Sequence, residues 1–277
     1  MSYKIVVDSC CELPEELLTD NRYERVPLSL EVGDYCIQDD ESFNQAEFLE
    51  KVAACPECPK SSCPSPEKYM EAYETEAEHV YAVTLSGHLS GSHNSAMLGR
   101  SLFKEKHGEK KICVFDSLSA SGGETQIALK IRDLEIAGFG FEEIIEKVQK
   151  FRDEMETFFV LDNLETLRKN GRLSRVKALV ASTMNIKPIL AADKGTIVQR
   201  SQSIGMRKAL NKMAEAFVKE VKEGHNRLII SHCNAKERAE AVKKAILSLR
   251  HFDEVLILDT AGISSMYAND GGIIVTA

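Results

Sequence analysis

Three cysteines stand close together in the stretch ACPECPKSSCPSPEKY (54–69), at Cys55, Cys58 and Cys63. Thiols at a C-x2-C-x4-C spacing could bind a metal, but a closed structural zinc site needs four ligands and this loop has no histidine. The spacing is also the reverse of the C-x4-C-x2-C order of plant-type ferredoxins. We therefore favour a cysteine-rich loop without metal and keep a metalloprotein as an alternative.

A second candidate site is the Ser/Gly-rich stretch TLSGHLSGSHNSA (84–96), which lies between an apolar strand and a helix. The free N–H groups at the start of a helix favour an anion. The hydroxyls of Ser86, Ser90 and Ser92 can donate to such an anion, and Gly91 lets the backbone approach it closely. The stretch is neither a P-loop nor a nucleophile elbow, and ordinary turn and capping chemistry would also explain it.

The same stretch contains two histidines, His88 and His93, beside these serines. A serine activated by a histidine base is the arrangement of a hydrolase nucleophile. A Ser/His enzyme that cleaves acyl esters through Ser90 or Ser92 is therefore a second alternative.

Hydroxyl side chains recur where predicted strands end. They follow three strands, at Asp8-Ser9, from Ser86 to Ser92, and at Asp116-Ser117. The pair Ser61-Ser62 precedes a predicted helix and offers two more hydroxyls. Since the carboxyl ends of parallel strands meet at one edge of a sheet, we expect these groups to surround one ligand.

Composition limits the class of protein. The chain has 277 residues, 43% of them hydrophobic, and a formal charge of 35 − 43 = −8. This acidic balance disfavours a nucleic-acid-binding protein, which needs a basic face. With no apolar stretch of membrane-spanning length and no signal-peptide pattern, the sequence predicts a cytosolic protein whose eight cysteines do not form a disulfide framework.

Strand and helix patterns alternate through the first half of the chain, which indicates a mainly parallel sheet covered on both faces. Strands are expected at 4–8, 80–85 and 111–116, with a longer extended segment at 25–37. Helices are expected at 12–21, 44–54, 67–79, 92–108, 121–137 and 141–155. We assign residues 1–156 to an N-terminal α/β lobe that carries the ligand loops.

The second half, residues 157–277, is assigned to a C-terminal α/β lobe with a β-hairpin insertion. Two strand-like runs around Asp193-Lys194-Gly195 predict the hairpin within 187–204. Ser174 is expected to cap a helix that follows it. Further strands are expected at 157–161, 227–232, 255–260 and 272–276, with helices at 206–222 and 235–250.

Five segments, in this order, resemble motifs of the DegV family of bacterial fatty-acid-binding proteins. They are KIVVDSCCELPEEL, PKSSCPSP, LSGHLSGSHNSA, VFDSLSAS and LETLRKNGRLSRVKALVASTMNIKPIL. The resemblance spans nearly the whole chain and implies two α/β lobes and no enzymatic activity. It implies a long-chain, palmitate-like fatty acid as ligand and no other cofactor. It further implies that a fatty acid kinase converts the acyl chain to an acyl phosphate for phospholipid synthesis.

By position, the resemblance assigns the fatty-acid carboxylate to Ser61, Ser62, Ser90, Gly91 and Ser92. Two of these, Ser61 and Ser92, stand where the family has Thr, which keeps the donor hydroxyl.

The C-terminal half departs from the family pattern. Tyr267 stands roughly where the family has a His, and Ile204 stands where an Arg is common. Arg172 and Arg207 are the candidates to replace the missing cation. In the cysteine loop, Cys63 occupies the position of a common family Gln and is the thiol expected to contact the site.

Overall fold

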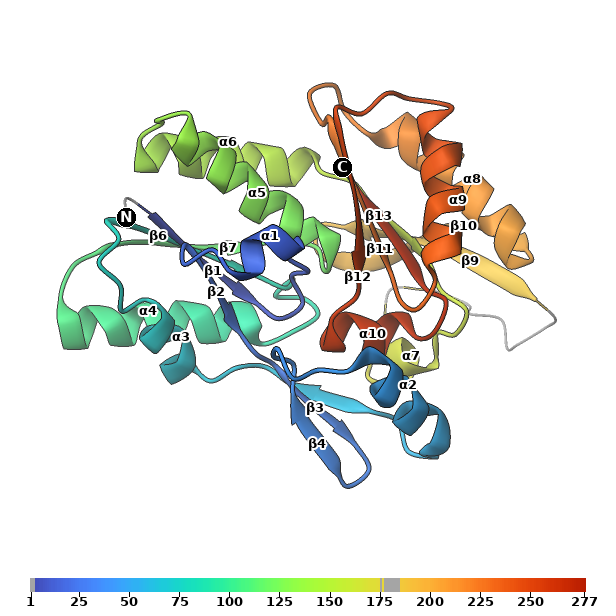
Figure 1. The fold of residues 1–277 in the computed structure, drawn as a ribbon, viewed down its shortest axis with the longest axis horizontal. Helices are drawn as coiled ribbons and strands as arrows, with labels where there is room; N and C mark the ends of the chain where they lie inside the picture. Colours follow the sequence, from blue (N-terminus) through green and yellow to red (C-terminus); the bar gives the residue numbers. More distant parts are fainter. Residues whose placement is uncertain (1–2, 175, 177–184) are drawn as a thin grey trace.

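Two large β-sheets and a small third sheet form the molecule, with helices packed around them (Figure 1). The computed structural model describes residues 3–174, 176 and 185–277. The predicted α/β class, with a parallel sheet flanked by helices in the first half and a hairpin in the second, is confirmed. The predicted division at residue 156 stays a prediction.

The first sheet is parallel throughout, in the order β2-β1-β6-β7. Its strands are β1 (Tyr3–Asp8), β2 (Tyr23–Val26), β6 (His79–Thr84) and β7 (Lys111–Asp116). Alternate residues pack on opposite faces, as the two-residue period of a strand requires. Ile5 and Val7 join the core beneath α5 (Gly122–Ile136) and α6 (Phe141–Glu154). Val6 joins the core beneath two helices on the other face, α3 (Pro66–Ala72) and α4 (Ser92–His107).

The second sheet is mixed, in the order β10-β9-β8-β13-β11-β12. Its strands are β8 (Thr157–Val160), β9 (Ile186–Asp193), β10 (Thr196–Ile204), β11 (Arg227–His232), β12 (Glu254–Asp259) and β13 (Ile273–Thr276). Among these strands only β11 and β12 pair in parallel. The predicted hairpin is β9–β10 at one edge of this sheet, and α8 (Met206–Glu220) and α9 (Lys236–Leu247) cover the outer face (Figure 1).

The third sheet joins β3 (Ser29–Val32), β4 (Tyr35–Gln38) and β5 (Lys60–Ser62), and α2 (Gln45–Ala54) precedes β5. The sequence predicted one extended segment at 25–37 and a loop around Ser61. The segment is instead divided between two sheets, whereas the turn that the Gly33-Asp34 pair predicts within it is present, with a φ of +58° at Gly33. The short strand β5 forms because residues 60–62 find partners on β3, about thirty residues earlier in the chain.

Several helices differ from the predicted lengths. The helix expected at 12–21 is only the four-residue α1 (Glu15–Leu18), and the one expected at 67–79 ends at Ala72. Two short helices, α7 (Glu165–Lys169) and α10 (Gly262–Ala268), complete the fold, and α10 was not predicted. The helix expected after Ser174 falls mostly outside the described residues.

Helix α5 packs against both large sheets. It contacts β1 and β6 of the parallel sheet and β11 and β13 of the mixed sheet. Its first residue, Gly122, is buried, and a Cβ there would meet Ile229 Cγ2 at 2.9 Å, Ser231 Oγ at 3.1 Å and Thr276 Oγ1 at 3.2 Å. The two sheets therefore share one helix, and Gly122 sets how closely that helix approaches the second sheet.

We expect Gly122→Ala to destabilise the protein by roughly 1–3 kcal/mol, because the added methyl group overpacks this contact. Urea unfolding would measure the loss as a lower midpoint at an unchanged m-value. Gly140→Ala is the matched control, since a Cβ at Gly140 meets no heavy atom within 4 Å. Equal stability of the two variants would contradict a tight contact at Gly122.

Candidate functional site

A cavity lies between the loops at the carboxyl edge of the parallel sheet and the inner face of the mixed sheet. Its volume is about 760 Å³, including the part that opens to solvent. Most of the residues that line it are apolar, and Arg172 is the only charged residue among the described ones that do. An apolar cavity with a few polar groups is typical of a pocket for an amphipathic small molecule.

The mixed sheet supplies one wall of the cavity. Phe159 and Leu161 line it, whereas the alternating residues Phe158 and Val160 pack under α8 and α9. Ala192, Ile197 and Ile274 continue the same wall from β9, β10 and β13. The two-residue period of these strands thus gives one face to the core and the other to the cavity.

Loops after the strands of the parallel sheet supply the opposite wall. They contribute Cys10, Leu85, Leu89 and the run from Leu118 to Ser121. Leu118 and Ser121 have φ angles of +53° and +58°, a region that non-glycine residues seldom occupy. Such backbone strain persists only where the surroundings hold it, and it is common at ligand sites.

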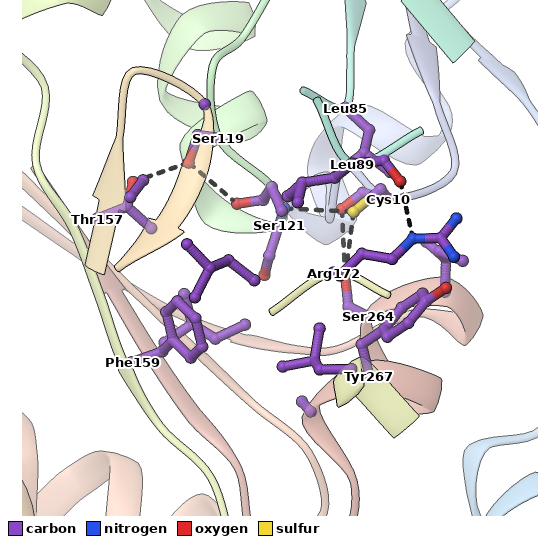
Figure 2. A pocket seen from close by; sticks show the side chains of 18 of the residues that line it. Cys10, Leu85, Leu89, Ser119, Ser121, Thr157, Phe159, Arg172, Ser264 and Tyr267 are labelled. Carbon is purple, nitrogen blue, oxygen red and sulfur yellow. Dashed lines mark hydrogen bonds between the residues drawn. The ribbon is translucent and has the colours of Figure 1, made fainter. Parts of the chain in front are cut away.

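Most of the hydroxyl groups that line the cavity bond to neighbouring protein groups rather than facing the cavity (Figure 2). Ser119 Oγ lies 2.7 Å from Thr157 Oγ1, and Ser121 Oγ donates to Glu12 Oε2 at 2.6 Å. Cys10 Sγ lies 3.5 Å from Ser264 Oγ. These residues line the cavity with their polar atoms already engaged, so the wall is apolar in effect.

Arg172 and Tyr267 form a polar group in the cavity wall. Arg172 Nε donates to the Leu89 carbonyl at 3.1 Å, and its guanidinium lies 5.8 Å from the centre of the Tyr267 ring (Figure 2). The Tyr267 hydroxyl is 3.4 Å from Ser61 Oγ. This chain of contacts joins the two predicted loops, those of Ser61 and Ser90, to Arg172 and Tyr267, which are two of the three residues predicted from the second lobe.

The remaining predicted residues have different positions. Ser90 Oγ donates to Ser92 Oγ at 3.2 Å, with Ser92 buried at the start of α4. Gly91 lies against Cys63, whose sulfur would be 2.9 Å from a Cβ at that position. Ser62 and Arg207 are exposed, and of all the predicted ligand-binding residues only Arg172 and Tyr267 are among those that line the cavity.

Three buried carboxyl groups lie behind the cavity wall, at Asp8, Glu12 and Glu124. Burial raises the pKa of Asp8 to about 6 and that of Glu12 to about 7, and it raises the pKa of Glu124 well above its usual range. The sequence indicated Asp8 as a strand-end residue but not the other two. Glu124 lies in the first turn of the helix predicted at 121–137, where an acidic residue is common because it complements the helix dipole, so the sequence carried no signal for its burial.

The three clustered cysteines contact different parts of the fold. Cys55 packs beside Gly33, Cys58 Sγ accepts a hydrogen bond from Asn170 Nδ2 at 3.7 Å, and Cys63 Sγ lies 3.7 Å from Ser95 Oγ. Within the described part of the chain, no group of three or more His, Cys, Asp or Glu side chains could hold a metal ion.

The Ser/His alternative requires a histidine ring within reach of a serine hydroxyl. His93 Nδ1 instead lies 3.4 Å from Thr84 Oγ1, and the His88 side chain is exposed. Ser90 and Ser92 bond to each other. The loop geometry therefore gives no support to a nucleophile–base pair.

No helix among residues 3–174, 176 and 185–277 is long and apolar enough to cross a membrane.

Comparisons with known proteins point to the same family over nearly the whole chain. A family model described as "Uncharacterised protein, DegV family" matches residues 2–276. A DegV domain-containing protein of Streptococcus pneumoniae is 34% identical over 278 residues, covering 99% of this chain and 98% of the relative.

Two solved structures are also similar to the chain. One is a DegV family protein from Ruminococcus gnavus with vaccenic acid, at 49% identity and a TM-score of 0.97, with 100% of both chains covered. The other is the Streptococcus pneumoniae Fatty Acid Kinase (Fak) B3 protein loaded with linoleic acid. It has 32% identity and a TM-score of 0.89, with 100% of this chain and 99% of that chain covered.

The buried Glu12 carboxyl makes stability depend on pH. Its pKa is about 7 in the folded state against an ordinary value of 4.5, so its contribution to stability is lost as pH rises through about 7. We expect Glu12→Gln to gain stability relative to the native protein between pH 5 and pH 8, on the order of 1–3 kcal/mol. Urea unfolding at both pH values would measure this, with exposed Glu16→Gln as control. A stability difference that does not change with pH would contradict a buried, neutral Glu12.

Proposed function

The chain belongs to the DegV family, and from this premise we propose that it binds a long-chain fatty acid without acting as an enzyme. The tail occupies the apolar cavity, and the carboxylate lies at its polar edge near Arg172, Tyr267, Ser61 and Ser90. The observation that carries the proposal is that Arg172 is the one charged residue among the described residues that line this mostly apolar cavity. The fatty acids in the two similar solved structures support it.

The tail and the head group contribute differently to binding. Burial of each CH2 group is worth roughly 0.8 kcal/mol, so about fifteen of them give on the order of 10 kcal/mol before ordering costs. Each hydrogen bond to the charged head adds about 1.5–3 kcal/mol. The tail therefore sets most of the affinity, and the serine, tyrosine and arginine groups set the orientation.

We further infer that the protein acts in the bacterial cytosol by presenting the bound carboxylate to a fatty acid kinase. The kinase forms the acyl phosphate, which then enters phospholipid synthesis. The name of the linoleic-acid-loaded relative, a Fatty Acid Kinase B3 protein, supports this role. Ser61 on β5 and Ser90 before α4 are both partly exposed, which would leave a head group between them accessible to a partner.

We expect Ala192→Phe to abolish lipid binding, because the larger ring fills the cavity beside Phe159. Native mass spectrometry of protein purified from cells, followed by lipid extraction, would compare the variant with the native chain. Ala137→Phe, at an exposed alanine, is the matched control. Absence of lipid from the native protein, or equal lipid content in a folded Ala192→Phe protein, would contradict the proposed site.

We expect Ser90→Ala to weaken binding about tenfold to a hundredfold and to leave some lipid bound, because the tail contacts remain. Acyl-phosphate formation with a fatty acid kinase should fall further than binding does, since the head group is no longer oriented. Lipid titration and a coupled kinase assay would separate the two effects. Complete loss of lipid from a folded variant would show that the head group, not the tail, dominates affinity.

A further inference from the structure

Helix α10 begins without a cap from its own segment. Ala261, the residue before it, offers no side-chain acceptor to the first N–H groups of the helix. The Asp39 carboxyl group supplies this cap from the first half of the chain. Its Oδ1 accepts the N–H of Gly262 at 2.7 Å, and its Oδ2 accepts the N–H of Ile263 at 2.8 Å. A helix of seven residues is not stable by itself, so the position of α10 depends on contacts of this kind.

Asp39 is itself fixed to the small sheet. It directly follows β4, its side chain is fully buried, and its backbone N–H donates to the Leu28 carbonyl at 2.8 Å. The start of α10 lies close against the same sheet, because a Cβ at Gly262 would meet Leu30 Cδ1 at 2.6 Å and Asp39 Oδ1 at 2.7 Å. Helix α10 is thus held by the small sheet, although it lies between two strands of the mixed sheet in the chain.

A second side chain, Gln45 on α2, also holds α10. Its Nε2 donates to the Thr260 carbonyl at 2.9 Å and to Ser265 Oγ at 3.2 Å. Its Oε1 accepts the N–H of Asn234 at 3.2 Å, which fixes the direction of the amide. Asp39 and Gln45 therefore hold the start and the middle of α10 from one short segment of the chain.

The opposite side of α10 faces the cavity and the proposed head-group site. Four of its residues line the cavity, at the spacing of one helix face: Ile263, Ser264, Tyr267 and Ala268. Figure 2 shows Tyr267 beside Arg172. The Tyr267 hydroxyl lies 3.4 Å from Ser61 Oγ on β5, and Ser61 is the register partner of Leu30 on β3. The place of the Tyr267 hydroxyl relative to Ser61 therefore depends on how α10 sits on the small sheet.

We propose that Asp39, assisted by Gln45, is a positioning residue that holds α10 so that the Tyr267 hydroxyl donates to the carboxylate of a bound fatty acid beside Ser61. Neither Asp39 nor Gln45 lines the cavity, so both act through the helix. This inference rests on the proposed fatty-acid-binding function. It adds that the orientation of the head group depends on a buried acid outside the binding site.

A double-mutant cycle with Tyr267→Phe separates positioning from a general effect on stability. We expect Asp39→Asn to raise the Kd for palmitate about tenfold, because a displaced tyrosine loses its hydrogen bond to the charged head group. In Tyr267→Phe protein the hydroxyl is already absent, so the same substitution should change the Kd less than about twofold. Fluorescence titration of delipidated protein would measure each Kd, and urea unfolding would show that each variant is folded.

Asp40→Asn is the matched control, since Asp40 Oδ1 accepts hydrogen bonds from the Ser42 N–H at 2.9 Å and from Ser42 Oγ at 2.6 Å, away from the cavity lining. We expect it to leave the Kd unchanged with and without Tyr267→Phe. Gln45→Ala is the second test variant, because Gln45 is partly exposed and its loss leaves the Asp39 cap in place. It should raise the Kd about threefold, and only when Tyr267 is present, which keeps the proposal testable if Asp39→Asn does not fold.

A rise in Kd by the same factor with and without the Tyr267 hydroxyl would overturn the proposal, because a loosened fold does not act through one hydroxyl. An unchanged Kd in every Asp39 or Gln45 variant that folds would also overturn it. So would a Tyr267→Phe protein that binds palmitate as tightly as the native protein does. Failure of the native protein to bind palmitate at all would instead overturn the proposed function.

Discussion

The Asp8 carboxyl group holds the backbone N–H groups of Cys10 and Leu85, which belong to the loops after two neighbouring strands. A buried carboxyl group is costly unless it is hydrogen-bonded, so these two bonds fix where both loops leave the sheet. One loop supplies Cys10 to the cavity wall and the other carries Leu89 and Ser90. The edge of the parallel sheet, and with it one side of the cavity, depends on this one side chain.

The cavity is formed where the carboxyl edge of the parallel sheet packs against the mixed sheet. Helix α5 packs against both sheets, and Ser86 Oγ donates to the Gly195 carbonyl at the tip of the β9–β10 hairpin at 2.8 Å. The hydroxyl groups of Ser119 and Ser121 are satisfied by Thr157 on β8 and by the buried Glu12 carboxyl group. A wall built from a serine-rich loop is thus apolar toward the cavity, because its hydrogen-bonding capacity is used elsewhere.

The sequence predicted the parts of this arrangement that local patterns control. Apolar runs and turn residues predicted the parallel strands, their helices and the hairpin. The strand-end hydroxyls that the sequence singled out, at Ser9, Ser86, Ser90, Ser92 and Ser117, are not among the residues that line the cavity. The sequence could not predict β5, which has three residues and depends on a distant partner, or the strand order of the mixed sheet. The sequence also did not show whether Arg172 or Arg207 is the cation near the site. The fold brings Arg172 to the cavity, whereas Arg207 is exposed on α8, a helix that covers the other face of the sheet.

An acidic protein that binds an anion must limit repulsion between its own carboxylates and the ligand. Here Asp8, Glu12 and Glu124 lie near the site, and their burial favours the uncharged forms. A neutral carboxyl group removes a repulsive charge and gains a proton that it can donate. With Arg172 as the one cation among the described residues of the lining, the local electrostatics can favour a carboxylate although the chain as a whole carries a charge of −8. Acids buried behind the serine loop are therefore compatible with anion binding because burial favours their uncharged form. The same acids at the surface would be ionised and would repel the anion.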